Sequence, residues 1–221
     1  QDKLEIISDS LATILQKELD PYDIALQTID VYVDSSILFI PDYDYSILAY
    51  DYSKSKTIKR FSGFTERIRK LSIHPNSEFL AFASNSNGLR IYDLKEISQK
   101  RQIDSKDPAY STAFSPDGTK LALVTNKQLL EYSFPDLEII KEIKLKGEYP
   151  NGDFGYLTNN LILKKDQREG LDIININSGK KELLKIKEAF KFSVNPINQI
   201  LAIKSGKDII YLYEYPSFKK K

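Results

Sequence analysis

The chain has 221 residues, enough to bury one sizeable hydrophobic core, and a single domain over residues 1–221 is predicted. Its 32 basic and 31 acidic residues leave a net charge of +1, without the basic excess that proteins use to follow nucleic-acid phosphates. Cysteine is absent and the only histidine is His74, which excludes disulfides, thiolate nucleophiles, zinc–sulfur sites and clusters of imidazole ligands within one chain. Neither nucleic acid nor a metal or other cofactor is therefore expected as a partner.

No segment approaches the roughly 18 consecutive apolar residues that a membrane-spanning helix needs, and no signal-peptide pattern opens the chain. The first residue is Gln1 and methionine is absent throughout, which is typical of an exported protein whose signal has been removed or of an excised part of a longer chain. Export is slightly favoured over a cytoplasmic location. The oligomeric state is not predicted.

Two structures remain open for residues 1–22. Residues 4–8 and 13–19 can be aligned with the third and fourth strands of a later repeat, which favours a partial blade or a latch strand. The competing interpretation is an amphipathic helix, because the apolar residues of 4–19 approximate one helical face.

A repeat of about forty residues organises the rest of the chain. Each copy contains an alternating strand, a turn and a second apolar strand. The turn prolines Pro75, Pro116 and Pro196 are separated by 41 and 80 residues, the second spacing being twice 40. Stepping by the same period leads to similar patterns around Asp34 and Thr158. Hairpins are predicted over residues 27–41, 69–84, 109–124, 152–164 and 189–204.

A third strand and a more polar fourth strand follow each hairpin. Third strands are predicted over residues 47–52, 89–94, 128–134, 171–176 and 208–213, and fourth strands are clearest over 57–61 and 137–144. Four short antiparallel strands per forty residues make one blade of a β-propeller. The predicted fold is therefore all-β, a propeller of four-stranded blades with five recognisable repeats.

The repeats resemble those of the WD-repeat family. The segment Phe114-Ser-Pro-Asp-Gly-Thr-Lys-Leu-Ala122 is similar to the family's first hairpin. The Trp-Asp pair of the family is represented by Tyr92-Asp93 and Tyr50-Asp51, although the chain has no tryptophan and no Gly-His pair. The resemblance covers roughly residues 25–215. It implies a propeller fold and says little about function.

The sequence leaves two possibilities for the number of blades in the complete ring. The C-terminus reaches residues 215–218 where the fourth strand of the last blade should begin. Residues 13–19 would supply that strand in a closed five-bladed ring. Alternatively, the chain is a segment of a ring with six or seven blades.

Candidate catalytic residues have structural interpretations. His74 precedes a turn proline, where sister repeats have Ser115 and Asn195, so a structural role is favoured over catalysis. Asp42 and Asp44 are typical of a solvated loop, with a cation site as the alternative. No nucleophile elbow, P-loop or dinucleotide motif is present in the sequence. An enzyme is not expected.

A binding face follows from the strand order. The connections between second and third strands, and between successive blades, must emerge on one face and are the longer ones. Tyrosine and arginine are enriched at interface hot spots. The candidate binding residues in these connections are Tyr43, Tyr45, Phe64, Arg67, Arg69, Tyr149 and Arg168.

These residues predict an interaction scaffold for a protein or peptide partner. The alternative is a small-ligand or hydrolytic site of carboxylates and arginines at the channel mouth. A third is a purely architectural propeller within a larger protein.

Overall fold

The computed structural model describes residues 30–31, 36–42, 45–62, 64–66, 68–85, 88–96, 98–145, 154–165, 170–186, 189–195, 198–205 and 209–220. The described strands form five sheets of four antiparallel strands, and in every sheet the spatial order follows the order along the chain. The first two sheets contain β1 (Asp30–Val31), β2 (Ile37–Pro41), β3 (Ile47–Asp51) and β4 (Lys56–Phe61), then β5 (Ile68–Ile73), β6 (Phe79–Ser84), β7 (Gly88–Asp93) and β8 (Ser98–Ile103). The third and fourth contain β9 (Ala109–Phe114), β10 (Lys120–Thr125), β11 (Gln128–Ser133) and β12 (Ile139–Lys144), then β13 (Phe154–Thr158), β14 (Leu161–Lys165), β15 (Gly170–Asn175) and β16 (Lys181–Lys185). The fifth contains β17 (Ala189–Asn195), β18 (Ile200–Ser205), β19 (Ile209–Glu214) and β20 (Lys219–Lys220).

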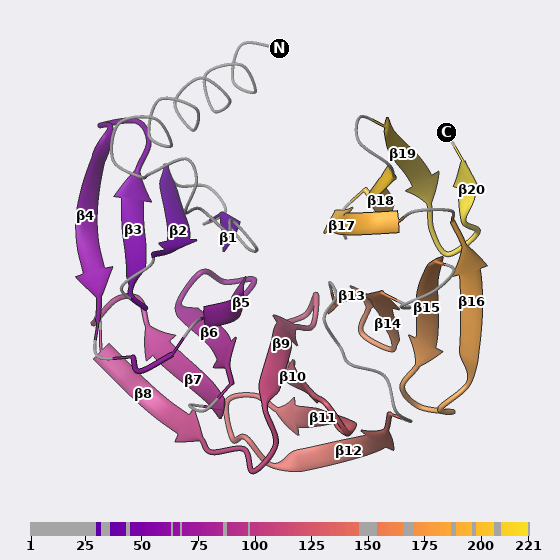
Figure 1. Ribbon diagram of the computed structural model, residues 1–221, viewed down its shortest axis with the longest axis horizontal. Helices are drawn as coiled ribbons and strands as arrows, with labels where there is room; N and C mark the ends of the chain where they lie inside the picture. Colours follow the sequence, from indigo (N-terminus) through magenta and orange to yellow (C-terminus); the bar gives the residue numbers. More distant parts are fainter. Residues whose placement is uncertain are drawn as a thin grey trace.

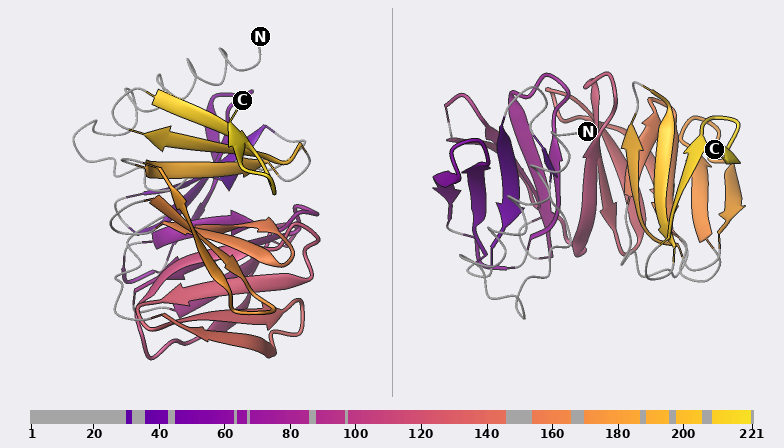
Figure 2. Two further views of the ribbon diagram at one scale, coloured as in Figure 1. Left: turned by 90° about the vertical axis from the view of Figure 1, so that its right-hand side faces the viewer. Right: turned by 90° about the horizontal axis from the view of Figure 1, so that it is seen from above.

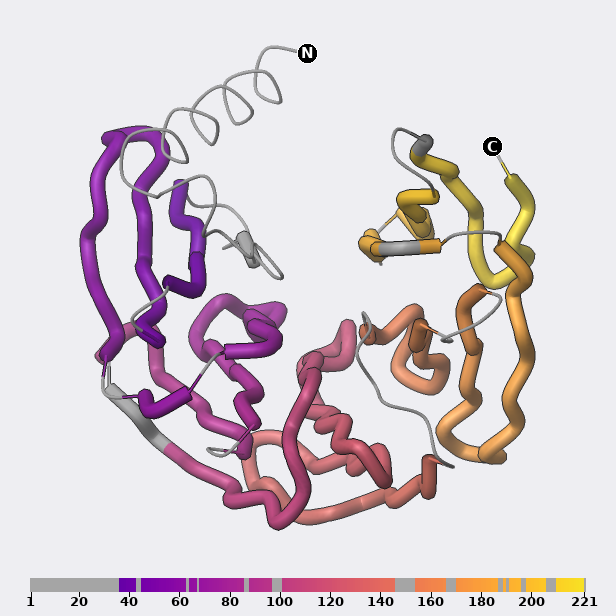
Figure 3. Tube along the Cα trace, viewed as in Figure 1, coloured from indigo at the N-terminus to yellow at the C-terminus, as the bar shows by residue number. Residues whose placement is uncertain are grey.

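The sheets are the blades of a β-propeller. Figure 1 shows the first strand of each blade, β1, β5, β9, β13 and β17, nearest the centre, and the fourth strands at the perimeter. The blades follow one another around an arc, and the described strands of the first and fifth blades lie at its two ends (Figures 1 and 3). The all-β propeller with five repeats is confirmed. No helix in the part of the chain that the structure describes is long and apolar enough to cross a membrane.

Burial explains why these segments form strands. On β6, all residues from Leu80 to Ser84 are buried because a neighbouring blade covers each face of the sheet. On β4, residues 56–60 are exposed, as expected at the outer edge. A strand near the centre of a blade is thus apolar and buried, as β6 is, and a strand at the outer edge is charged and exposed, as β4 is.

Most of the hydrophobic core lies between blades, although one further cluster, of Leu38, Ile40, Leu48 and Tyr50, lies within the first blade. Four clusters of buried side chains each join two successive blades. Between the first and second blades, for example, Phe39 and Ala49 pack with Leu71 and Phe82. Every inter-blade contact is therefore a small core of its own.

Tyr92 belongs to this core at the first interface. Its ring lies 5.4 Å from that of Phe61 and 5.8 Å from that of Phe82, measured between centroids. Ala81, Phe82 and Ile91 are fully buried, whereas Tyr92 is half-buried.

The fourth strand of the last blade begins within the C-terminal residues. β20 pairs with β19 through Tyr213 and Lys220 and through Glu214 and Lys219. The sequence predicted that this strand begins within residues 215–218, and in the structure it begins at Lys219. Residues 1–22, including the proposed latch over 13–19, lie outside the described residues.

Candidate interaction face

The antiparallel strand order divides the connections between two faces of the propeller, which Figure 2 shows at opposite ends of the strands. We call one the loop face; it carries the connections from second to third strands and from blade to blade. The other, the turn face, carries the connections from first to second and from third to fourth strands. The loop-face connections are residues 42–46, 62–67, 85–87, 104–108, 126–127, 145–153, 166–169, 186–188 and 206–208.

Polar groups of the turn face join neighbouring blades. The Nε2 atom of His74 lies 2.9 Å from the carbonyl oxygen of Gly118 in the next blade. In turn, the Asp117 amide donates to Asn159 Oδ1 at 3.2 Å, and Lys120 Nζ donates to the Asn159 carbonyl at 3.1 Å. His74 therefore has a structural position in a series of turn-to-turn contacts.

Asp117 also organises its own turn. Its carboxylate accepts hydrogen bonds from Ser115 Oγ at 2.6 Å and from the Thr119 amide at 3.0 Å. Burial acts to raise the pKa of Asp117, but the hydrogen bonds from Ser115 and Thr119 outweigh it and hold the pKa below its ordinary value. The Pro-Asp-Gly sequence is thus explained by turn chemistry.

The aspartates that end the third strands have a similar role. Asp51 accepts the Ser53 amide at 3.0 Å and the Lys54 ammonium at 2.9 Å, while Asp93 accepts the Lys95 amide at 2.8 Å. Each carboxylate closes the turn into the fourth strand. These positions of the repeat are therefore accounted for by the stability of the turn face.

On the loop face, Tyr45 belongs to the connection between β2 and β3 of the first blade. The Asp42 amide donates to the Ser46 carbonyl at 2.8 Å, and Arg60 Nη1 donates to both Asp42 Oδ2 and Ser46 Oγ at 2.7 Å. Tyr45 has a φ of 64° and remains 45% exposed. Tyr45 is thus exposed beside Asp42 and Ser46, whose polar groups form hydrogen bonds within the protein.

Phe64 occupies a different environment from Tyr45. Its ring centroid lies 4.7 Å from that of Phe82 and 6.0 Å from that of Tyr92, in edge-to-face arrangements. Phe64 is half-buried. It anchors the connection between the first two blades, which leaves only part of the ring for a partner.

Arg69 is placed by a β-bulge at the start of β5. Ile68 pairs with Ser84 and Lys70 with Ala83, so Arg69 is the extra residue. A bulge redirects the side chain of its extra residue. Arg69 Nε donates to Asn85 Oδ1 at 3.1 Å.

The next blade has the same kind of β-bulge, with Tyr110 as the extra residue. On β9, Ala109 pairs with Thr125 and Ser111 with Val124, which leaves Tyr110 as the extra residue. The guanidinium carbon of Arg69 lies 5.9 Å from the centroid of the Tyr110 ring, within the range of cation–π contacts. Two adjacent blades thus bring an arginine and a tyrosine together beside the loop face.

Tyr110 was missed by the sequence interpretation, although a signal was present. It follows Arg69 by 41 residues, and Phe190, the extra residue of a bulge on β17, follows Tyr110 by 80. These are the spacings of the turn prolines. Of the other predicted site residues, Tyr43, Arg67, Tyr149 and Arg168 lie outside the described residues.

No protein-family model matches the chain. Curated relatives of the chain include proteins named eukaryotic translation initiation factor 3 subunit I. The protein of Aspergillus fumigatus is 26% identical over 111 residues, covering 50% of this chain and 33% of the relative. That of Emericella nidulans is 25% identical over 118 residues, covering 53% and 34%. The matches therefore span about a third of these relatives.

Among solved structures, the β-propeller domain of Cps50 (Swd1) from Myceliophteria thermophila is similar, with a TM-score of 0.69 and 14% sequence identity. The likeness covers 86% of this chain and 65% of that one. None of the comparisons supports the prediction of an exported protein. Together with the five observed blades, these likenesses support a WD-repeat-like β-propeller.

Proposed function

We propose that this chain is a non-enzymatic scaffold whose loop face binds a protein or peptide partner. The observation that carries the proposal is the pairing of Arg69 with Tyr110, which bulges on two adjacent blades bring together. Arginine and tyrosine contribute disproportionately to binding energy at protein interfaces. Because rigid strands hold these side chains, little binding energy is spent on ordering them.

The contrast between the two faces supports the choice of face. On the turn face, His74, Asp117 and Asn159 are engaged in contacts between blades. On the loop face, Tyr45 is exposed beside Asp42 and Ser46, which accept hydrogen bonds from Arg60. Tyr43, Arg67, Tyr149 and Arg168 belong to the same proposed surface by their positions in the chain.

The relatives are also consistent with a protein partner. The curated proteins are named as a subunit of a translation initiation factor, which places them in an assembly. A hydrolytic site at the channel mouth receives less support. Asp42 forms an ion pair with Arg60 on an outer strand at 2.7 Å, and His74 is engaged in a turn of the opposite face.

Affinity measurements with a selected peptide test the proposal. A peptide is selected against the whole chain from a random-sequence display library and its Kd is measured by calorimetry. Arg69→Ala, Tyr110→Ala and Tyr45→Ala are expected to weaken binding by about 1–3 kcal/mol at one or two of the three positions, the usual cost at a hot spot.

Two control substitutions lie elsewhere on the surface. Arg101→Ala removes an equal charge from the outer strand β8, and Asn198→Ala removes an exposed amide from the turn face. Both should leave the Kd within about twofold, as neutral surface contacts do. If the control variants lose binding while the loop-face variants retain it, the partner does not bind the loop face and the proposal is wrong.

A further inference from the structure

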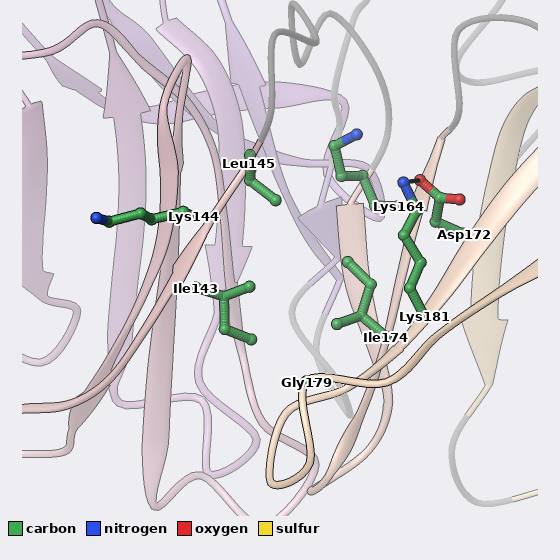
Figure 4. Close-up of a pocket in the computed structure, with 8 residues that line it drawn as sticks. All are labelled: Ile143, Lys144, Leu145, Lys164, Asp172, Ile174, Gly179 and Lys181. Atoms are coloured by element: carbon green, nitrogen blue, oxygen red, sulfur yellow. Dashed lines mark ion pairs between the residues drawn. The ribbon is translucent and has the colours of Figure 1, made fainter.

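Several basic side chains of this molecule have a carboxylate partner. In the cavity between the third and fourth blades, Lys181 Nζ lies 2.7 Å from Asp172 Oδ2, an ion pair that Figure 4 shows. On the loop face, Arg60 Nη1 lies 2.7 Å from Asp42 Oδ2. A partly buried cation without such a partner has lost hydration that no anion of the protein replaces, so it is a place where an external anion can bind.

Arg69 is a partly buried cation of this kind. It is half-buried near the loop-face end of β5, and its Nε atom donates to Asn85 Oδ1 at 3.1 Å. Within the part of the chain that the structure describes, its two Nη groups have no hydrogen-bond acceptor, and no carboxylate forms an ion pair with it. Asn85 thus holds one edge of the guanidinium and leaves the other N–H donors without an acceptor.

Tyr110 adds a second donor beside Arg69. Its ring centroid lies 5.9 Å from the guanidinium carbon, and the two residues come from β5 and β9, which are neighbouring inner strands (Figure 1). The Tyr110 hydroxyl forms no hydrogen bond with any residue that the structure describes. Arg69 and Tyr110, which we call the Arg–Tyr site, therefore offer a positive charge and several donors. This combination suits an anionic hydrogen-bond acceptor.

The acidic side chains of the connection between the second and third blades are engaged by other groups. Asp107 Oδ1 lies 2.5 Å from Lys127 Nζ. Asp104 accepts a hydrogen bond from Gln102 and lies 4.0 Å from Arg90 Nη1. Neither carboxylate neutralises the Arg–Tyr site, so an acid supplied by a partner can take that place.

We propose that the Arg–Tyr site binds the carboxylate of an aspartate or glutamate side chain in a partner peptide. The site lies on the loop face, so the inference rests on the function proposed above and specifies the chemistry of the partner. The planar donors of a guanidinium match a carboxylate in a bidentate arrangement. A carboxylate also balances the single charge of Arg69.

A phosphate dianion would require a second cation at the Arg–Tyr site. Lys127 is already paired with Asp107. Lys106, in the connection that leads into β9, is exposed, and solvent and salt screen an exposed charge. A carboxylate is therefore the better match.

Two random-sequence display libraries, selected against the whole chain, test the proposal. They are identical except for one fixed central residue, which is glutamate in one library and glutamine in the other. The tightest binder of the glutamate library is synthesised with a C-terminal amide, so that only side chains supply carboxylates, and its Kd is measured by calorimetry. Replacing the fixed glutamate of this peptide with glutamine is expected to weaken binding at least about tenfold, because a charge-assisted hydrogen bond is lost.

The dependence on Arg69 identifies the site. In Arg69→Gln, the change from glutamate to glutamine in the peptide should alter the Kd less than about threefold, since the carboxylate has already lost its partner. Arg101→Gln is the matched control, because it removes the same charge from the outer strand β8, where Arg101 Nη1 donates to the Asp136 carbonyl at 3.0 Å. This control should keep the full tenfold dependence. An equal effect of the glutamate in Arg69→Gln and in the parent protein would overturn the proposal.

Charge reversal makes the test independent of how Arg69→Gln folds. Arg69→Glu should bind the peptide with arginine at the fixed position more tightly than the peptide with glutamate, which is the reverse of the parent protein. An unfolded variant cannot invert a preference. A retained preference for glutamate in Arg69→Glu would contradict the proposed contact.

The remaining outcomes separate the acidic ligand from the scaffold function. Peptides whose binding depends on Tyr45 but is equal with glutamate and glutamine would overturn the carboxylate ligand and leave the scaffold function standing. The absence of any binder from both libraries would overturn both. Replacement of the fixed glutamate with phosphoserine should not strengthen binding; a gain of at least about tenfold would assign a phosphate to the site and show that the carboxylate is wrong.

Discussion

At the scale of single residues, Asp51 shows why an aspartate ends the third strand of a blade. Its carboxylate accepts the Lys54 ammonium at 2.9 Å and the hydroxyls of Ser36 and Ser53 at 2.7 Å each. The hydrogen bond from Lys54, followed by those from Ser36 and Ser53, holds the pKa of Asp51 well below its usual range. The charged form is therefore favoured in the folded protein.

This shift predicts acid sensitivity. A carboxyl group whose pKa is lowered by folding stabilises the protein above its unfolded-state pKa of about 3.9, and the contribution is lost as the pH falls through the folded-state value. Asp51→Asn should therefore show a smaller loss of stability between pH 5 and pH 2 than the parent protein. Urea midpoints across this range measure the difference, with the exposed Asp136→Asn as control. Parallel pH profiles for Asp51→Asn and the parent would exclude the role assigned to Asp51.

Residue-scale features were the least predictable from sequence. Tyr45 was expected in a loop-face connection, which the strand order alone predicts, and it is exposed there. Phe64 was expected on the same surface, but its ring packs against Phe82 and Tyr92. Tyr110 was missed because a bulge changes the direction of one side chain without changing the hydrophobic alternation around it.

At the scale of elements, the hairpin turns act as connectors between blades as well as within them. Gly118 has a φ of +73°, and a Cβ atom at this position would lie 2.4 Å from His74 Nε2. The glycine thus permits both the turn and the close approach of the histidine from the previous blade. Periodic prolines revealed the hairpins, but the identity of the residue that contacts Gly118 depends on blade packing, which periodicity does not contain.

Substitution of Gly118 tests two requirements, the positive φ of the turn and the close approach of His74. Gly118→Ala should destabilise the protein by more than Gly179→Ala, because Gly179 has a similar φ of +69° with no atom within 4 Å of an added Cβ. Gly179→Ala is expected to cost about 1 kcal/mol for the backbone alone, and Gly118→Ala about 1–3 kcal/mol more from overpacking against His74.

Chemical denaturation midpoints of the two single variants and of Gly118→Ala combined with His74→Ala complete the test. The double substitution should cost less than the two single substitutions added together, since removal of the imidazole relieves the contact. Strict additivity would show that His74 does not restrict position 118.

At the scale of the whole molecule, the chain is an array of blades with one hydrophobic cluster at each junction. The first and fifth described blades lie at the two ends of an arc (Figure 1), so the described blades contact mainly their neighbours. In such arrays, stability is approximately a sum of the intrinsic stability of each repeat and the interfaces between neighbours. The forty-residue period was sufficient to predict this architecture. It could not identify the arrangement at the ends of the array, where the repeat pattern is weakest.

Equivalent tyrosines at two distant junctions can test this independence of blades. Tyr92 packs against Phe61 and Phe64 at the junction of the first and second blades, whereas Tyr213, in the corresponding position of the fifth blade, joins the cluster shared with the fourth. Tyr92→Ala should cost about 3 kcal/mol, the low end for loss of a buried aromatic ring, because Tyr92 is only half-buried. Native-state hydrogen exchange should then accelerate in β3 and β6 but remain unchanged in β15 and β18, while Tyr213→Ala produces the reverse pattern. Uniform acceleration across all five blades in either variant would mean that the propeller unfolds as one cooperative unit despite its separate inter-blade cores.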